Sequence, residues 1–175
     1  MALLKTVGLC KYFGGLKAVN HVDMEVQQGQ VFGIIGPNGA GKTTFFNLCA
    51  GTIPATEGEI WFDGKNITGY RPHMAAKAGI ARTFQNIQLF QNTTVLENVA
   101  VGFHIHTNTN MLDAVLGNAR QKNTEKEIYE KGAALLERLE LGQYKDTLAK
   151  NLPYGIQRKV EIARALAISP KILLL

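Results

Sequence analysis

Residues 36–43 combine glycines, a lysine and a threonine at a spacing that can bind phosphate. They read Gly-Pro-Asn-Gly-Ala-Gly-Lys-Thr and match the phosphate-loop pattern G-x-x-x-x-G-K-[ST]. Gly39 and Gly41 let the backbone turn without Cβ clashes, so that successive N–H groups can point at an anion. Lys42 is predicted to reach the β- and γ-phosphate oxygens, and the Thr43 hydroxyl to help hold Mg²⁺. The segment therefore predicts binding of a nucleoside polyphosphate.

The flanking residues supply the elements that such a loop needs. Residues 31–35 form a short apolar run that predicts a buried strand. Residues 43–50 contain no Gly or Pro and predict a helix, whose positive dipole end adds to an anion site. A strand, a Gly-rich turn and a helix in this order form the expected context of the motif. The predicted nucleotide-binding residues here are Gly36, Pro37, Asn38, Gly39, Ala40, Gly41, Lys42, Thr43 and Thr44.

The composition is that of an ordinary globular chain and argues against several classes of protein. The 175 residues are 46% hydrophobic and 19% charged, enough for one domain with a core and a small subdomain. The net charge is +5, and the basic residues are scattered along the chain, which favours a solvated surface over a nucleic-acid patch. We expect no signal peptide, because no basic segment is followed by an apolar one. We expect no membrane span, because no apolar run approaches about 20 residues. Cys10 and Cys49 are predicted to be buried free thiols in a reducing compartment rather than metal ligands.

Short strands are predicted before and after the phosphate loop. Residues 3–10 and 22–26 have the apolar spacing of strands, and residues 59–62 lead into the hairpin signal Asp63-Gly64. We therefore expect an antiparallel β layer beside a nucleotide-binding α/β core.

Helical patterns dominate the second half of the chain. Thr94 and Glu97 have the spacing of a capping box that opens a helix to about residue 101. A second capping box is predicted at Thr124–Glu127, opening a helix that Gly142 closes. Further predicted elements are a helix over 72–81, an extended run over 82–85, a short helix near 111–116, a helix after 158, and a strand from 172.

Three motifs then stand in one order along the chain. The phosphate loop is followed by Arg-Thr-Phe-Gln, which ends at Gln85, and by Leu-Pro-Tyr-Gly-Ile-Gln-Arg at 152–158. From about residue 4 to residue 175 this set resembles the ATP-binding subunits of ABC transporters. The resemblance places Gln85 at the Q-loop glutamine, which senses Mg²⁺ and the attacking water. It places Phe13, with Tyr12 as the alternative, at the aromatic that stacks on adenine. It places Gly155 and Gln157 in the signature motif, where they would contact nucleotide.

Several segments are similar to one branch of that family. Residues 13–19, 39–47, 81–85 and 94–98 resemble the ATPase subunits of bacterial high-affinity branched-chain amino acid importers. The resemblance implies ATP and Mg²⁺ as cofactors, with Lys42 and Gln85 in catalytic roles and Thr43 and Gln85 at the metal. It also implies a second ATPase subunit, transmembrane permease subunits and, indirectly, a substrate-binding protein as partners, and no nucleic acid.

The same resemblance implies an architecture and a location. The expected fold is a RecA-like P-loop NTPase core of class α/β, with an antiparallel β layer and an inserted helical subdomain. The core would comprise residues 1–85 and 161–175, and the subdomain carrying the signature motif would comprise residues 86–160. The protein is expected to bind peripherally to the cytoplasmic face of the inner membrane.

Two departures from the family pattern affect the expected chemistry. Pro153 stands where the signature serine would donate a hydroxyl to the γ-phosphate of ATP, Tyr154 replaces a glycine, and Ile156 replaces a glutamine. The Walker B aspartate and the general-base glutamate would follow Leu175 directly. We therefore expect a C-terminally truncated chain that binds nucleotide without turnover by itself.

Other interpretations stay open at this point. A GTPase or small-molecule kinase leaves residues 152–158 unexplained, and an ABC-type ATPase acting on nucleic acid predicts basic or coiled-coil insertions that the sequence lacks. An ABC ATPase for another substrate is a further alternative, because substrate choice in such systems resides in other subunits. Individual residues have alternatives too. Phe13 could pack in the core, and Arg158 and Lys159 could lie on a solvated helix face. His104 and His106 could lie in a loop or form a metal pair, and Leu89 and Phe90 could form a docking patch or pack in the core.

Overall fold

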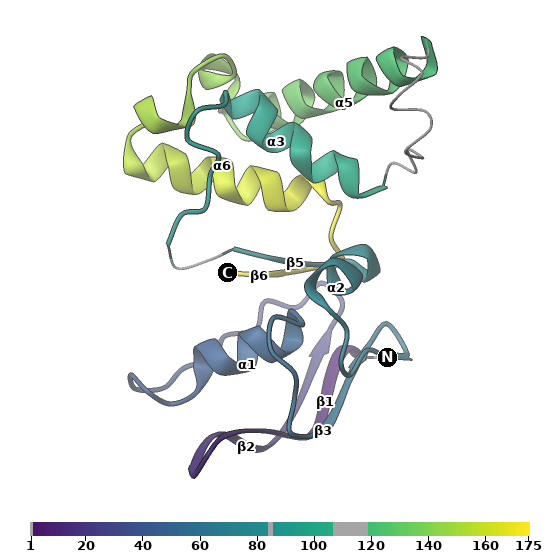
Figure 1. Ribbon diagram of the computed structural model, residues 1–175, viewed down its shortest axis with the longest axis vertical. Helices are drawn as coiled ribbons and strands as arrows, with labels where there is room; N and C mark the ends of the chain where they lie inside the picture. Colours follow the sequence, from purple (N-terminus) through teal and green to yellow (C-terminus); the bar gives the residue numbers. More distant parts are fainter. Residues whose placement is uncertain (1, 84–85, 107–118) are drawn as a thin grey trace. The chain divides into compact units, whose positions relative to one another are not determined.

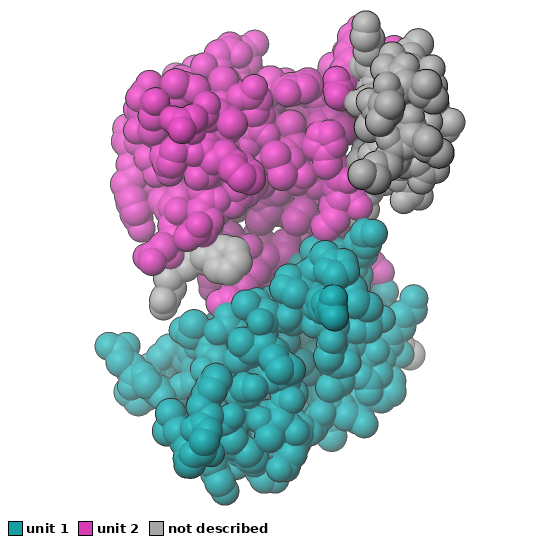
Figure 2. All heavy atoms as spheres, in the orientation of Figure 1, with its two compact units in different colours: residues 1–80 teal, residues 81–175 magenta. Residues whose placement is uncertain are grey.

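The chain folds into two compact units, residues 1–80 and residues 81–175. The computed structural model describes residues 2–83, 86–106 and 119–175 (Figure 1). Figure 2 colours the two units separately. Unit 1 carries the antiparallel sheet and the phosphate loop, and unit 2 carries the helices that follow.

An antiparallel sheet forms the frame of unit 1. Its strands are β1 (Ala2–Phe13), β2 (Leu16–Gln27), β3 (Glu57–Phe62) and β4 (Lys65–Asn66), in the order β2-β1-β3-β4. The predicted strands at 3–10, 22–26 and 59–62 are thus confirmed. The hairpin between β3 and β4 turns at Asp63 and Gly64, with φ of 49° and 74°. Two positive φ values in a two-residue turn match the right-handed twist of the flanking strands. The buried side chains of this layer include Leu4, Leu9, Ile60 and Phe62.

Residues 31–35 do not form the predicted strand. They have no regular secondary structure, and Val31 and Ile35 are 100% and 98% exposed. A strand exists only through ladder hydrogen bonds to a neighbour. Within the described residues, no strand pairs with this segment, so its apolar character alone cannot make it one.

Two helices complete unit 1. Helix α1 (Lys42–Cys49) confirms the helix predicted after the phosphate loop. Helix α2 (Pro72–Ala78) ends earlier than predicted, because Gly79 takes a left-handed φ of 110° and accepts the role of C-cap. The residues after Gly79 form the short strand β5 (Ile80–Arg82), which pairs with β6 (Ile172–Leu174).

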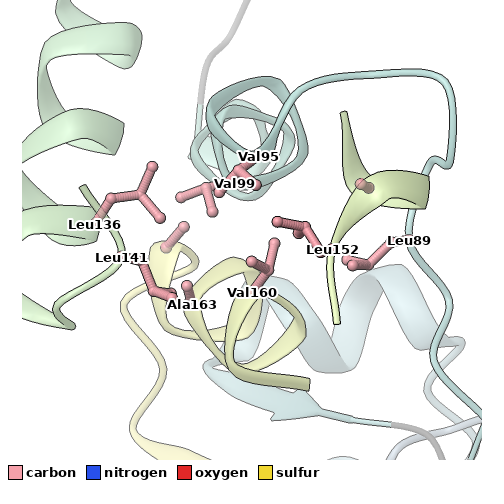
Figure 3. Close-up of a cluster of buried hydrophobic side chains, with 10 residues drawn as sticks. Leu89, Val95, Val99, Leu136, Leu141, Leu152, Val160 and Ala163 are labelled. Carbon is pink, nitrogen blue, oxygen red and sulfur yellow. The ribbon is translucent and has the colours of Figure 1, made fainter. Parts of the chain in front are cut away.

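Three helices of unit 2 share one apolar core. They are α3 (Val95–Phe103), α5 (Ala119–Arg138) and α6 (Tyr154–Ala167), with short 3₁₀ turns at η1 (His104–His106), η2 (Gly142–Tyr144) and η3 (Ala149–Asn151). Val95 and Val99 of α3 face Val160 and Ala163 of α6 (Figure 3). Other members of this core are Leu89, Leu136, Leu141, Ala149, Leu152 and Ala167.

Several predicted helix boundaries are wrong. Thr124 lies inside α5 instead of opening it, so the second capping box does not form a helix start. Helix α5 ends through Glu140, whose φ is 58°, and not through Gly142. The N–H of Glu140 donates to the carbonyl of Glu137 and that of Leu141 to Leu136, the two bonds of a Schellman motif. The predicted helix near 111–116 lies outside the described residues.

Candidate functional site

The phosphate loop is a tight turn that leads directly into α1. Gly39 and Gly41 have φ of 84° and 82°, in the left-handed region that glycine adopts at no steric cost. The N–H of Ala40 donates to the Pro37 carbonyl at 3.3 Å, and that of Phe45 donates to the Gly41 carbonyl at 2.8 Å. Gly41 is the N-cap of α1, and no side chain among the described residues caps this helix. The first N–H groups of α1 therefore open toward the loop.

Gly41 is also the point where the loop touches the sheet. A Cβ atom added to Gly41 would overlap the backbone carbonyl of Ala18 in β2. A Cβ on Gly39, by contrast, would meet no atom within 4 Å. The two glycines thus have different roles. Gly39 allows the chain to turn, whereas Gly41 allows both the turn and close packing of the loop against β2.

Lys42 folds back over the loop that precedes it. Its Nζ donates to the carbonyl oxygens of Gly36 and Pro37, at 2.6 and 2.7 Å. In both bonds the acceptor is an exposed, neutral backbone carbonyl, which can bond to water when the ammonium group leaves. An anion placed over the loop would offer the ammonium group a stronger, charge-assisted partner. The neighbouring Thr43 exposes its side chain at the first turn of α1.

A cavity of about 600 Å³ lies beside the loop. It is lined by residues of β2, by residues 32–35, and by Ala40, Gly41 and Lys42. This volume is typical of a site for a small molecule or cofactor. Of the predicted nucleotide-binding residues 36–44, only Ala40, Gly41 and Lys42 are among the described residues that line this cavity.

Phe13 lies at the β1–β2 turn and is 50% exposed, so the alternative of core packing is wrong for this residue. Its ring carries the Lys11 ammonium 5.2 Å from its centroid. Phe13 is not among the described residues that line the cavity. The neighbouring Tyr12 has a ring 5.7 Å from Lys17 Nζ, and a hydrogen bond with the Cys10 side chain raises the pKa of Tyr12 to about 12.

The 152–158 motif forms the start of α6 in unit 2. The sequence places these residues before a helix, but the structure has Tyr154 to Arg158 already in its first turns. Pro153 is the N-cap, and its carbonyl accepts the N–H groups of Ile156 and Gln157 at 2.9 and 3.0 Å. The Gln157 side chain folds back, its Nε2 donating to the Leu152 carbonyl at 3.0 Å. Gly155 is exposed, and a Cβ there would meet nothing within 4 Å.

Arg158 does not lie on a plain solvated face. Its Nη1 donates to Oε2 of Glu161 at 2.6 Å, and Glu161 is 2% exposed. Its Nη2 donates to the hydroxyl of Thr83 at 3.3 Å. Arg158 therefore joins α6 to the residue that follows β5. Lys159, in contrast, is exposed. Gln85, two residues beyond Thr83, lies outside the described residues.

Comparison with known proteins decides the family. Residues 19–175 match the family model described as "ABC transporter". The chain belongs to the ABC transporter family. It is 43% identical over 173 residues to the high-affinity branched-chain amino acid transport ATP-binding protein BraF of Pseudomonas aeruginosa. The aligned region covers 99% of this chain and 68% of BraF. It is 39% identical to LivG of Escherichia coli strain K12, with the same coverage, and 41% identical to the probable LivG of Archaeoglobus fulgidus, with 100% and 67% coverage.

Solved structures of ABC ATP-binding cassettes share the fold. A nucleotide-free cassette from an ABC transporter has a TM-score of 0.82 at 39% identity, and covers 99% of this chain and 68% of its own. The ADP conformation of another cassette also has a TM-score of 0.82, at 38% identity, with 99% and 67% coverage. These findings confirm the predicted P-loop NTPase fold and the predicted family. This ABC protein is an ATP-binding subunit homologous to the ATPases of branched-chain amino acid importers.

Leu89 and Phe90 differ in burial, so core packing holds for Leu89 and not for Phe90. Leu89 is buried in the core of unit 2, whereas Phe90 is 53% exposed. Phe90 lines a groove of about 550 Å³ with Val101, Ile105, Arg164 and Ile168. The Arg164 guanidinium lies 5.8 Å from the centre of the Phe90 ring. Burial of this guanidinium lowers the pKa of Arg164. No group of three potential metal ligands among the described residues includes His104, and the alternative of a metal pair with His106 stays a prediction.

Sequence reasoning missed Asn98 as the residue that holds the Phe90 loop. Asn98 is 0% exposed, and its Oδ1 accepts the N–H of Phe90 at 2.9 Å. Its Nδ2 donates to Phe90 O, Thr93 Oγ1 and Thr94 O, at 3.1, 2.8 and 3.0 Å. A polar residue on an otherwise apolar helix face, four residues after a cap, was the available signal.

In the described part of the chain, no helix combines the length and hydropathy needed to cross a bilayer.

Proposed function

We propose that this ABC protein binds MgATP at residues 36–44 and hydrolyses it, within a dimer of ATPase subunits, to drive a permease for branched-chain amino acids. The observation that carries the proposal is the phosphate loop, in which two left-handed glycines and the uncapped start of α1 surround Lys42. The names of the relatives from Pseudomonas aeruginosa and Escherichia coli support the transported substrate.

Lys42 is the central group in the proposed chemistry. On nucleotide binding, its ammonium would leave the Gly36 and Pro37 carbonyls and contact the β- and γ-phosphate oxygens. There it would stabilise the charge that develops as water attacks the γ-phosphate in line. The exposed Thr43 hydroxyl has the chemistry of an Mg²⁺ ligand, and the ion, when held by Thr43 and Gln85, would neutralise the β- and γ-phosphates. We propose that Phe13, exposed at the β1–β2 turn, stacks on adenine.

The role of Lys42 is tested by Lys42→Ala, measured by equilibrium binding of a fluorescent ATP analogue. We expect ATP affinity to fall by about 100-fold, because charge-assisted bonds to phosphate are lost. Lys65→Ala, on the exposed strand β4, is the matched control and should bind as the parent does. Equal affinities for the parent and Lys42→Ala would contradict the proposal.

The second half of the ATP site is proposed to come from α6 of a partner subunit. Gly155 and Gln157 lie at a helix start whose first turn contains no acidic residue, and such a start favours an anion. A cassette of 26% identity and TM-score 0.78 has been solved as a dimer, in a post-hydrolysis state bound to ADP and Pi. We also keep the division into a core, 1–85 with 161–175, and a helical subdomain, 86–160, as part of the proposal.

The groove at Phe90 is proposed to receive a transmembrane permease subunit at the cytoplasmic face of the membrane. An exposed aromatic with a partly buried arginine beside it has the composition of an interface centre. Phe90→Ala should reduce co-purification with the permease by about tenfold or more while leaving ATP binding unchanged. Tyr129→Ala, another exposed aromatic in unit 2, is the control. Full retention of the permease by Phe90→Ala would exclude this groove.

A further inference from the structure

Three potential metal ligands meet on neighbouring strands of the unit 1 sheet. Cys10 lies on β1, His21 on β2, and Glu57 on β3. One ligand atom from each residue lies within 4.8 Å of the other two. No other group of three such side chains occurs in the parts of the chain that the structure describes. None of its three members is among the described residues that line the cavity beside the phosphate loop.

Irregular backbone geometry brings these residues together. The pairing of β1 with β3 shifts register between Val7 and Cys10, and the pairing of β1 with β2 shifts between Leu9 and Lys11. Such bulges re-aim side chains that a regular strand would point elsewhere. After the shift, Cys10 pairs directly with Glu57. His21 has a φ of 49°, a strained value for a residue with a Cβ atom, and this conformation brings its ring toward Cys10.

The distances suit a shared cation. Cys10 Sγ and His21 Nδ1 are 3.6 Å apart. A tetrahedral zinc ion with ordinary Zn–S and Zn–N bonds separates its sulfur and nitrogen ligands by about 3.5 Å. The backbone N–H of His21 also donates to Cys10 Sγ at 3.1 Å, a bond that strengthens when the sulfur is a thiolate. The Cys10 thiol donates to the Gly8 carbonyl at 3.4 Å, and this bond is lost when the thiol gives up its proton.

We propose that Cys10, His21 and Glu57 form a binding site for a borderline-soft divalent cation, of which Zn²⁺ is the best match. Thiolate, imidazole and carboxylate together form a ligand set that zinc prefers over magnesium or calcium, and water completes the tetrahedron. Binding transfers the proton of the Cys10 thiol to solvent as the sulfur–metal bond forms. The cation enters from solvent, because His21 and Glu57 are exposed while Cys10 is buried. Asn20 Oδ1, now 3.1 Å from His21 Nδ1, turns away to free that nitrogen.

Cobalt substitution tests this site directly. The full chain, stripped of metal by a chelator and kept reduced, is titrated with Co²⁺ and then with Zn²⁺ under the same conditions. We expect a sulfur-to-cobalt charge-transfer band that saturates at one equivalent and disappears when Zn²⁺ displaces Co²⁺. Absence of this band in the parent protein at saturating Co²⁺ would overturn the proposal, since it requires a metal–thiolate bond.

Single variants then assign the ligands. Cys10→Ser should abolish the band, and Glu57→Gln and His21→Asn should each weaken Zn²⁺ binding by about tenfold or more. Asparagine is chosen at position 21 because it tolerates the left-handed backbone and removes only the imidazole. Cys49→Ala and His73→Asn, outside the cluster, should bind as the parent does. A band that survives in Cys10→Ser or vanishes in Cys49→Ala, or unchanged Zn²⁺ affinity in both His21→Asn and Glu57→Gln, would refute the assignment. Circular dichroism spectra confirm that each variant is folded.

Discussion

Helices α3 and α6 pack into the same core but begin in opposite ways. At the start of α3, the Thr94 hydroxyl accepts the N–H of Glu97 at 3.2 Å, and a Glu97 carboxylate oxygen accepts the N–H of Thr94 at 2.7 Å. At the start of α6, Pro153 has no donor or hydroxyl to contribute, and no side chain among the described residues caps the helix. The start of α3 is thus satisfied by its own side chains, whereas that of α6 is not.

The start of α1 in unit 1 resembles α6 in this respect. Gly41 provides no side chain, and neither α1 nor α6 has an acidic residue in its first turn. An acid there would stabilise the helix but repel a phosphate group. The difference between α3 and the other two therefore separates a helix start that serves stability from helix starts that can serve an anion.

The largest effect is expected from changing the glycine that starts α1. In Gly41→Ala the new Cβ would overlap the Ala18 carbonyl at a left-handed φ, so the loop must leave β2. We expect ATP affinity to fall at least 100-fold, an effect of about 3 kcal/mol, measured by fluorescent nucleotide binding.

Gly39→Ala is the matched comparison for that change. It carries the same left-handed strain but no overlap, because no atom lies within 4 Å of its Cβ. Strain alone costs about 1–2 kcal/mol, so its loss of affinity should be smaller. Equal losses in both variants would show that contact with β2 is unimportant.

An intermediate effect is expected at the self-satisfied start of α3. Thr94→Ala removes the cap hydroxyl and should lower the free energy of unfolding by about 1 kcal/mol in urea titrations, with ATP binding unchanged. Hydrogen bonds from the Thr94 backbone and side chain lower the pKa of Glu97. The folded-state pKa is then below the unfolded one, so this stabilisation is present above about pH 4.3 and is lost as the pH falls further. The variant should lose the part of that pH dependence that comes from the hydroxyl, because alanine keeps the backbone bond; an unchanged pH profile would show that the hydroxyl contributes nothing to it.

The smallest effect on stability is expected at the open start of α6. Pro153→Ser supplies the cap oxygen that α6 lacks, and should raise the free energy of unfolding by no more than about 1 kcal/mol. The measurement is the same urea titration, with Lys159→Ser on the exposed face of α6 as control. A destabilisation larger than that of Thr94→Ala would mean that Pro153 supports α6 in a way that the comparison overlooks.

Local patterns in the sequence predicted most of what local forces determine. The glycines of the phosphate loop, the Asp63-Gly64 turn and the Thr94–Glu97 capping box each act over a few residues, and each is confirmed in the structure. The run 31–35 failed because strand formation depends on a partner elsewhere in the chain. The second capping box failed because helical contacts continue through Thr124.

Two site features that escaped prediction depend on distant residues, unlike the short-range bonds of Asn98. The hydrogen bond of Arg158 to Thr83, and the meeting of Cys10 with His21 and Glu57, join elements far apart in sequence. The meeting of Cys10 with His21 and Glu57 depends on register shifts in β1, and no residue pattern within β1 predicts these shifts. The residue pattern located the phosphate loop and the family resemblance located the signature motif, while the partners of these residues required the fold.

The position of the phosphate loop in the chain has a consequence for folding. The loop and α1 lie between β2 and β3, so that pairing of β1 with β3 closes a long segment around them. The β1–β2 hairpin turns through two residues and can form early, whereas closing a long segment costs more entropy and comes later. Gly41 can rest on Ala18 only once β2 is in place. The phosphate site should therefore appear late in refolding, and recovery of nucleotide binding should lag behind formation of the hairpin.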